Sequence, residues 1–175
     1  MNAIVVEQMQ DETKLAFEVH RNAAINRVRL ARAKAASQAI DEAPKSHISV
    51  EFAFKSKPLS APPNVLRLEI AFRMAGVKEQ AKGREAAPDK KPETLVSVEC
   101  AYEVDYSLRE GFEATAEHVE AFKDGNAIFN AWPYFREYLQ NNLQRMGFPP
   151  LTAPFLRLQP KPQLRERKKN KHAGR

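Results

Sequence analysis

The sequence predicts an α+β fold in which an antiparallel sheet is followed by a long helix. Three segments, 47–55, 65–74 and 95–108, alternate between apolar and polar residues. Alternation of this length is typical of an antiparallel sheet with one apolar face and one wet face. The stretch from Asn126 to Met146 instead spaces its apolar residues with the 3.6-residue period of a helix. At 175 residues, a single domain is the default expectation.

The apolar side of the predicted long helix is too wide to be buried by a single neighbouring element. Its main stripe consists of Ile128, Trp132, Phe135, Leu139, Leu143 and Met146, and the flanking residues are Phe129, Ala131, Tyr134 and Tyr138. Together they span roughly 200° of the circumference, about twice the arc of an ordinary surface helix. We therefore expect this helix to be buried from two directions. Pro133 lies inside it and should kink it.

The N-terminal part is less regular. Residues 1–11 are expected to be a frayed lead-in, and 11–22 to be a helix with acidic residues in its first turn. The segment 25–38 is ambiguous. Its Ala, Arg and Lys content favours a helix, and local reasoning leans that way, although Val28 and Leu30 alternate with polar residues as in a strand.

Prolines and glycines predict where the elements end. Pro58, Pro62 and Pro63 are expected to break the chain between the first two alternating segments, and the charged stretch 76–92 to form a mobile loop. A short helix over 113–122 should end near Gly125, and the long helix at Gly147. The proline-rich stretch that follows should run extended. Its expected apolar anchors are Phe148, Leu151, Phe155 and Leu158.

The charge of the chain is concentrated at its C-terminal end. The net charge is +6, and residues 161–175 hold seven cations and one anion, so the rest of the chain is neutral. We interpret 159–175 as a disordered basic tail. Nucleic-acid binding through this tail is an alternative function, and a structural adaptor with one fixed partner is another.

No motif in the sequence predicts catalysis. It contains no glycine-rich nucleotide loop and no G-x-S-x-G, and its four histidines have no metal-ligand spacing. Cys100 is the single cysteine and is interpreted as a small core residue. Glu99, Glu103 and Asp105 are interpreted as a solvated sheet face. We expect no enzyme, cofactor or metal, and a cytoplasmic protein, because neither a signal peptide nor a membrane span is evident.

Two motifs in the second half resemble the SecB family of export chaperones. The run from Asn130 to Glu137, NAWPYFRE, resembles the family's helix signature, in which Pro-Tyr is followed by any residue and then Arg-Glu. The run from Gly147 to Pro154, GFPPLTAP, resembles its Phe-Pro loop. The order of alternating strands before the helix is also similar. The resemblance covers roughly residues 25–158, leaving 1–24 as an N-terminal extension.

The resemblance implies a SecB-like fold, a four-stranded antiparallel sheet followed by a long helix, with 25–38 as its first strand. Here an N-terminal helix precedes the sheet. The resemblance also implies a homotetramer built as a dimer of dimers, with the long helices sandwiched between extended sheets. The candidate oligomer-interface residues are Ile128, Phe129, Trp132, Phe135, Tyr138, Leu139 and Leu143.

The function that the resemblance implies is that of an ATP-independent holdase for unfolded polypeptides. Its clients would be preproteins destined for export and translocation or an antitoxin. The candidate client groove comprises Val50, Phe52, Tyr134 and Leu151, with Phe54 added by alternation. Plain core packing remains the alternative role for each. Proline-rich chain replaces the family's second C-terminal helix, which makes the protein more similar to the toxin–antitoxin-linked type and weakens the case for SecA as a partner.

Overall fold

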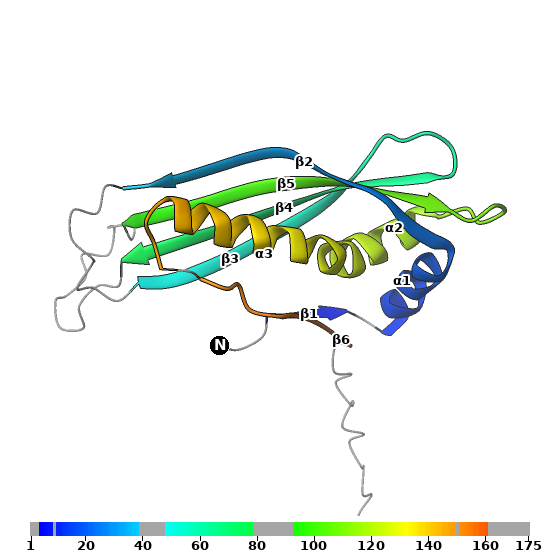
Figure 1. Ribbon diagram of the computed structural model, residues 1–175. Coiled ribbons are helices and arrows are strands. Elements are labelled where there is room, and N and C mark those ends of the chain that lie inside the picture. The colour runs from blue at the N-terminus through cyan, green and yellow to red at the C-terminus, as the bar shows by residue number, and fades with distance from the viewer. Residues whose placement is uncertain (1–3, 9, 39–47, 79–92, 150, 161–175) are drawn as a thin grey trace, which may run out of the picture.

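The computed structural model describes residues 4–8, 10–38, 48–78, 93–149 and 151–160 (Figure 1). It has the predicted α+β fold, with an N-terminal helix, a four-stranded antiparallel sheet and a long helix. The elements in chain order are β1 (Ile4–Gln8), α1 (Gln10–Asn22), β2 (Ala23–Ser37), β3 (Ile48–Leu59), β4 (Val65–Lys78), β5 (Thr94–Leu108), α2 (Ala116–Phe122), the π-helical turn η1 (Lys123–Ala127), α3 (Ile128–Arg145) and β6 (Leu156–Pro160).

The four long strands are ordered β2-β5-β4-β3, so β2 and β3 form the edges of the sheet. All three strand pairings are antiparallel. The ambiguous segment is strand β2, as the resemblance implied, because pairing along most of β5 overrides its helical propensity. Pro58 does not break the chain. It lies within β3, where an edge strand tolerates a residue without an N–H donor.

The core lies between one face of the sheet and α3, which runs along that face (Figure 1). The Phe135 ring stacks on Phe72 of β4, with 4.8 Å between ring centroids and an interplanar angle of 14°. Leu139 is also fully buried. The helical stripe and the strand alternation predicted from the sequence therefore meet in one layer. No helix in the described ranges is long and apolar enough to cross a membrane.

The two ends of the described chain meet in a small second sheet. Strand β1 pairs in parallel with β6, so the expectation of a frayed lead-in over 1–11 is wrong for Ile4–Gln8. The segment has no alternation long enough to predict a strand. Its partner lies at the other end of the chain, where local sequence gives no indication of it.

Glycines mark two further differences from the sequence expectations. Gly125 does not end a helix, because the chain continues from α2 through η1 into α3 and Gly125 is buried in that turn. Gly76 lies inside β4, since the strand extends beyond it to Lys78, and the rest of the expected loop falls outside the described residues. Gly147 does end α3, with a φ of +80°.

Candidate client-binding surface

The segment that follows α3, residues 151–155, runs along one flank of the helix, and we call it the strap. The Trp132 indole Nε1 donates to the Pro154 carbonyl oxygen at 3.0 Å. Arg136 Nε donates to the Ala153 carbonyl oxygen, also at 3.0 Å. Two side chains of the helix motif thus hold the strap. Neither role was predicted from the sequence, although an indole and a guanidinium on one helix flank both need acceptors.

The strap presents an aromatic side chain to solvent. Phe155 is 70% exposed, and the Arg136 guanidinium carbon lies 4.8 Å from its ring centroid. Its predicted role as an anchor is wrong. Neighbouring residues of an extended chain point in opposite directions, and Leu156 takes the buried position. Phe129 lies two helical turns before Arg136, on the same flank, and is 49% exposed.

Edge strand β3 extends the same flank. Phe52 is half-buried, with its ring centroid 6.1 Å from that of Trp132 and 6.5 Å from that of Phe135. Val50, two residues earlier on the same strand face, is 38% exposed. Because Trp132 contacts both β3 and the strap, these elements lie on one side of α3. The strap-side apolar surface thus consists of Val50, Phe52, Phe54, Phe129, Leu151 and Phe155.

Tyr134 lies on the opposite flank, so the structure separates it from the other candidate client residues. Its ring centroid is 6.0 Å from that of Tyr102 on β5, and its carbonyl oxygen accepts from the Tyr102 hydroxyl at 3.0 Å. Tyr102 is paired with Leu30 of β2, which is 44% exposed. We call Ile25, Leu30 and Tyr134 the β2-side apolar surface.

Most candidate interface residues are already buried within one chain. The five that are at most 4% exposed are Ile128, Trp132, Phe135, Leu139 and Leu143. Phe129 is half exposed and Tyr138 is half-buried. The chain's own sheet and strap therefore cover the main stripe of α3. A second copy is not required to bury the stripe, and only its flanks are open to a partner.

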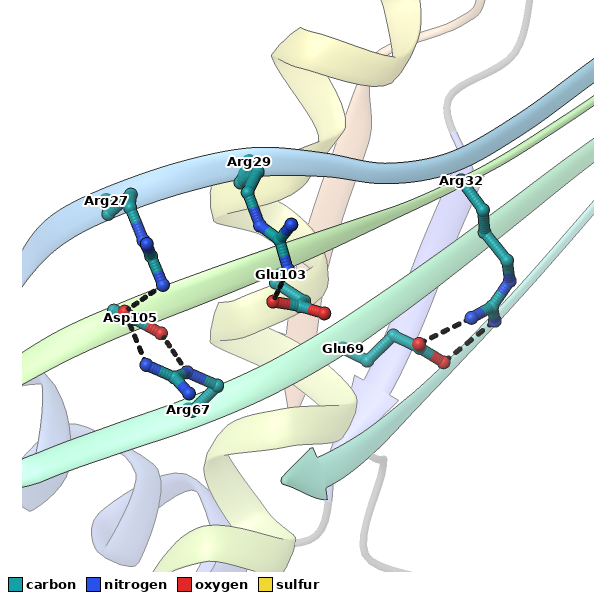
Figure 2. Close-up of polar contacts among 7 residues, drawn as sticks. All are labelled: Arg27, Arg29, Arg32, Arg67, Glu69, Glu103 and Asp105. Carbon is teal, nitrogen blue, oxygen red and sulfur yellow. Dashed lines mark hydrogen bonds and ion pairs between the residues drawn. The ribbon is translucent and has the colours of Figure 1, made fainter. Parts of the chain in front are cut away.

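The face of the sheet that points away from α3 carries a network of ion pairs (Figure 2). Asp105 is only 5% exposed, because Arg27 and Arg67 both bind its carboxylate, with nitrogen–oxygen distances of 2.9 and 2.6 Å. Arg32 makes two hydrogen bonds to Glu69, at 2.6 and 2.8 Å. The interpretation of a solvated face is therefore wrong for Asp105, whose neighbouring arginines exclude water from it.

The thiol of Cys100, the single cysteine in the sequence, lies in the core. Burial raises the pKa of the Cys100 thiol to about 12, so the thiol stays protonated and unreactive at neutral pH. Burial also raises the pKa of Tyr106 to about 12. Among the described residues, no group of three or more His, Cys, Asp or Glu side chains could hold a metal ion. The strap-side surface is suited to binding by apolar contact.

A structural comparison identifies a protein of known type with this architecture. The SecB-like chaperone Rv1957 of Mycobacterium tuberculosis, solved in complex with a ChAD peptide from the Rv1956 HigA1 antitoxin, superposes with a TM-score of 0.67 at 22% sequence identity. The match covers 84% of this chain and 99% of that chain. This chain has the SecB-like fold. The likeness predicted from the NAWPYFRE and GFPPLTAP motifs is confirmed at the level of the fold.

The other comparisons add no argument. No protein-family model matches the sequence, and no curated protein matches it either. A protein of unknown function from Streptococcus agalactiae superposes with a TM-score of 0.41 at 8% identity, over 76% of this chain and 97% of that chain. That likeness is too weak for any inference about function.

Proposed function

We propose that this protein is an ATP-independent holdase that keeps an aggregation-prone client segment in solution by covering its apolar side chains. The observation that carries this proposal is the strap-side apolar surface, where Phe155 and Phe129 expose 70% and 49% of their surfaces. Large apolar side chains exposed on one flank of a protein are typical of a binding site. Mass action alone suffices for holding, because the bound client is withdrawn from aggregation.

The surface suits an extended client segment with a few large apolar residues. Covering each such side chain contributes roughly 1.5–3 kcal/mol, and the cost of association cancels part of the total. Four such contacts contribute at most about 12 kcal/mol, so after an association cost of at least about 4 kcal/mol the dissociation constant is on the order of micromolar at its tightest. Such a complex is stable enough to protect a client and weak enough to release it.

An antitoxin is the client class that we favour. The superposing Mycobacterium tuberculosis chaperone was solved with an antitoxin peptide, and the SecB-like fold here includes the strap and α3 that form the strap-side surface. On this proposal the protein acts in the cytoplasm and without SecA. The exposed aromatics would hold the antitoxin segment until the cognate toxin binds.

We further propose self-assembly through the β2-side apolar surface, as part of a homotetramer. β2 is an edge strand of the sheet within the described chain, and Leu30 and Tyr134 are 44% and 46% exposed beside it. An edge strand of fifteen residues with solvent-exposed apolar side chains favours pairing with a second copy. The test is sedimentation: Leu30→Asp should lower the assembly state, whereas Val50→Asp should leave it unchanged.

The holdase proposal is tested by light scattering from a chemically denatured substrate protein, without nucleotide. Wild-type protein should suppress aggregation, and Phe155→Asp combined with Phe129→Asp should lose most of this protection. Phe17→Asp is the matched control, because Phe17 is 56% exposed but lies on α1. Phe52→Asp is a poorer test, since Phe52 also packs on Trp132 and Phe135. Equal protection by the double variant and wild type would refute the site.

A further inference from the structure

The face of the sheet opposite α3 contains a hollow of about 600 Å³ that the holdase proposal does not use. Strand register explains it. Ala71 lies in one cross-strand row and Ala53 in the next, and both line the hollow, so two small side chains leave space on this face. Longer side chains from all four strands surround this space. Those with charge are Arg32, Lys34, Lys55, Arg73 and Glu99.

The charge around the hollow is unbalanced, with four cations and one anion. Two of the cations already have partners: Arg32 binds Glu69, and Arg73 Nε lies 3.4 Å from Glu99 Oε1. Lys34 and Lys55 are exposed, and neither makes an ion pair with another residue in the described ranges. The hollow thus has two available ammonium groups, one on β2 and one on β3, beside a floor of methyl groups.

We propose that this hollow binds an acidic segment of a partner protein. Carboxylates of that segment would pair with Lys34 and Lys55, and its aliphatic carbons would pack on Ala53 and Ala71. Complementary charge at a concave site raises local concentration and fixes the register of the bound segment. The hollow and the strap-side surface lie on opposite faces of the sheet, so this partner and a client can be bound together.

The charge pattern favours a peptide over nucleic acid. Glu99 lines the hollow itself, and Glu103 and Glu69 lie in the adjacent cross-strand row. A phosphate backbone carries one negative charge per nucleotide and would meet these carboxylates as well as the lysines. A peptide can place acidic residues at Lys34 and Lys55 and a neutral or basic residue near Glu99, which gives it the better match.

The test is fluorescence anisotropy with a fluorescein-labelled peptide made of Glu, Asp and Ala, added to the full-length protein at low salt. Lys34→Glu combined with Lys55→Glu should weaken binding at least about tenfold. The matched control is Lys168→Glu combined with Lys169→Glu, which makes the same change in net charge within the basic C-terminal segment. This control should change the affinity by less than about twofold. Phe155→Asp combined with Phe129→Asp, the variant expected to lose holdase activity, should not change peptide binding.

Three results would overturn the proposal. One is an equal or larger loss of affinity in the Lys168/Lys169 control, which would assign binding to the basic segment. Another is tighter binding of single-stranded oligothymidine than of the peptide, if Lys34→Glu combined with Lys55→Glu weakens both to the same extent. If the reversed-charge variant lacks the wild-type circular dichroism spectrum, Lys34→Gln combined with Lys55→Gln replaces it. The neutralised variant should still weaken peptide binding by about threefold or more, and unchanged affinity would also overturn the proposal.

Discussion

The two faces of the central sheet follow the same alternation but are shielded from water in different ways. On the inner face, the apolar side chains lie under α3, and Phe135 and Leu139 from that helix are fully buried. On the outer face, Asp105 and Glu69 are only 5% and 7% exposed, although no helix covers them in the described chain. Arginine side chains cover these carboxylates while keeping part of their own surface in water. Long charged side chains can therefore shield individual carboxylates on a sheet face that no helix covers.

The largest effect is expected on the inner face. Phe135→Ala removes the ring that stacks on Phe72 and leaves a cavity, so the free energy of unfolding should fall by about 3–5 kcal/mol. Urea unfolding followed by the fluorescence of Trp132, the single tryptophan, measures this. Phe129→Ala is the control on the same helix, and should change stability by no more than about 0.5 kcal/mol because Phe129 is half exposed. Similar losses in both variants would contradict the observed burial.

On the outer face, Asp105→Asn should cost about 2 kcal/mol, less than a core deletion. The variant keeps the shape of the side chain but removes the charge that holds Arg27 and Arg67 together, and a hydrogen bond to a charged group is worth about 1.5–3 kcal/mol. Urea unfolding at neutral pH gives the difference. A loss below about 0.5 kcal/mol would show that the arginines do not shield this carboxylate.

The same contacts make the outer face sensitive to acid. The hydrogen bond from Arg67, helped by the charge of Arg27, lowers the pKa of Asp105 against the opposing effect of burial. Hydrogen bonding to Arg32 lowers the pKa of Glu69 in the same way. Both pKa values are lower folded than unfolded, so this stabilisation is complete above the unfolded values of about 3.9 and 4.3 and is lost as pH falls through the folded values. Urea unfolding between about pH 6 and pH 2 should show a smaller decline for Asp105→Asn than for wild type.

Close approach of strands β4 and β5 predicts a smaller loss. A Cβ atom at Gly76 would lie 2.7 Å from Val96 Cγ1, so Gly76→Ala should destabilise the protein by about 1–2 kcal/mol through overpacking. In a Val96→Ala background the cost of Gly76→Ala should fall, because the opposing methyl group is gone. If Gly76→Ala destabilises the Val96→Ala variant as much as it destabilises wild type, the clash with Val96 is not the cause.

The smallest effect is expected at the rim of the outer face. The carboxylate of Glu99 is half exposed and lies 3.4 Å from Arg73, so Glu99→Gln should change the free energy of unfolding by less than about 1 kcal/mol. Urea unfolding beside Asp105→Asn gives the comparison directly. If Glu99→Gln lowers the free energy of unfolding as much as Asp105→Asn does, then the burial of Asp105 under two arginines adds nothing to stability.

The sequence predicted the sheet and helix because their patterns are local. Alternation placed Phe52, Phe72 and Val98 on one face, and the 3.6-residue period placed Phe135 and Leu139 against it. β2 needed the family resemblance, since its Ala, Arg and Lys content favours a helix and only pairing with β5 makes it a strand. β1 was missed, because its partner β6 lies at the far end of the chain.

The candidate site was predicted less completely. Val50 and Phe52 lie on the face that alternation indicated, and Leu151 lies in the strap. The family resemblance grouped Tyr134 with them, whereas in the structure Tyr134 packs against Tyr102 on the other flank of α3. The exposure of Phe155 was also missed. In an extended segment held by Trp132 and Arg136, the side chain that points outward depends on which carbonyl groups those residues bind.

The parallel pairing of β1 with β6 has a consequence for native-state opening. It joins segments at opposite ends of the described chain, so closing this contact costs more loop entropy than closing the hairpin of β3 and β4. Backbone amides of β6 should then exchange with deuterium earlier than those of β5, which is paired on both sides. Partial release of this end would uncover the Trp132 flank of α3 while the sheet stays folded, enlarging the area that a client can reach.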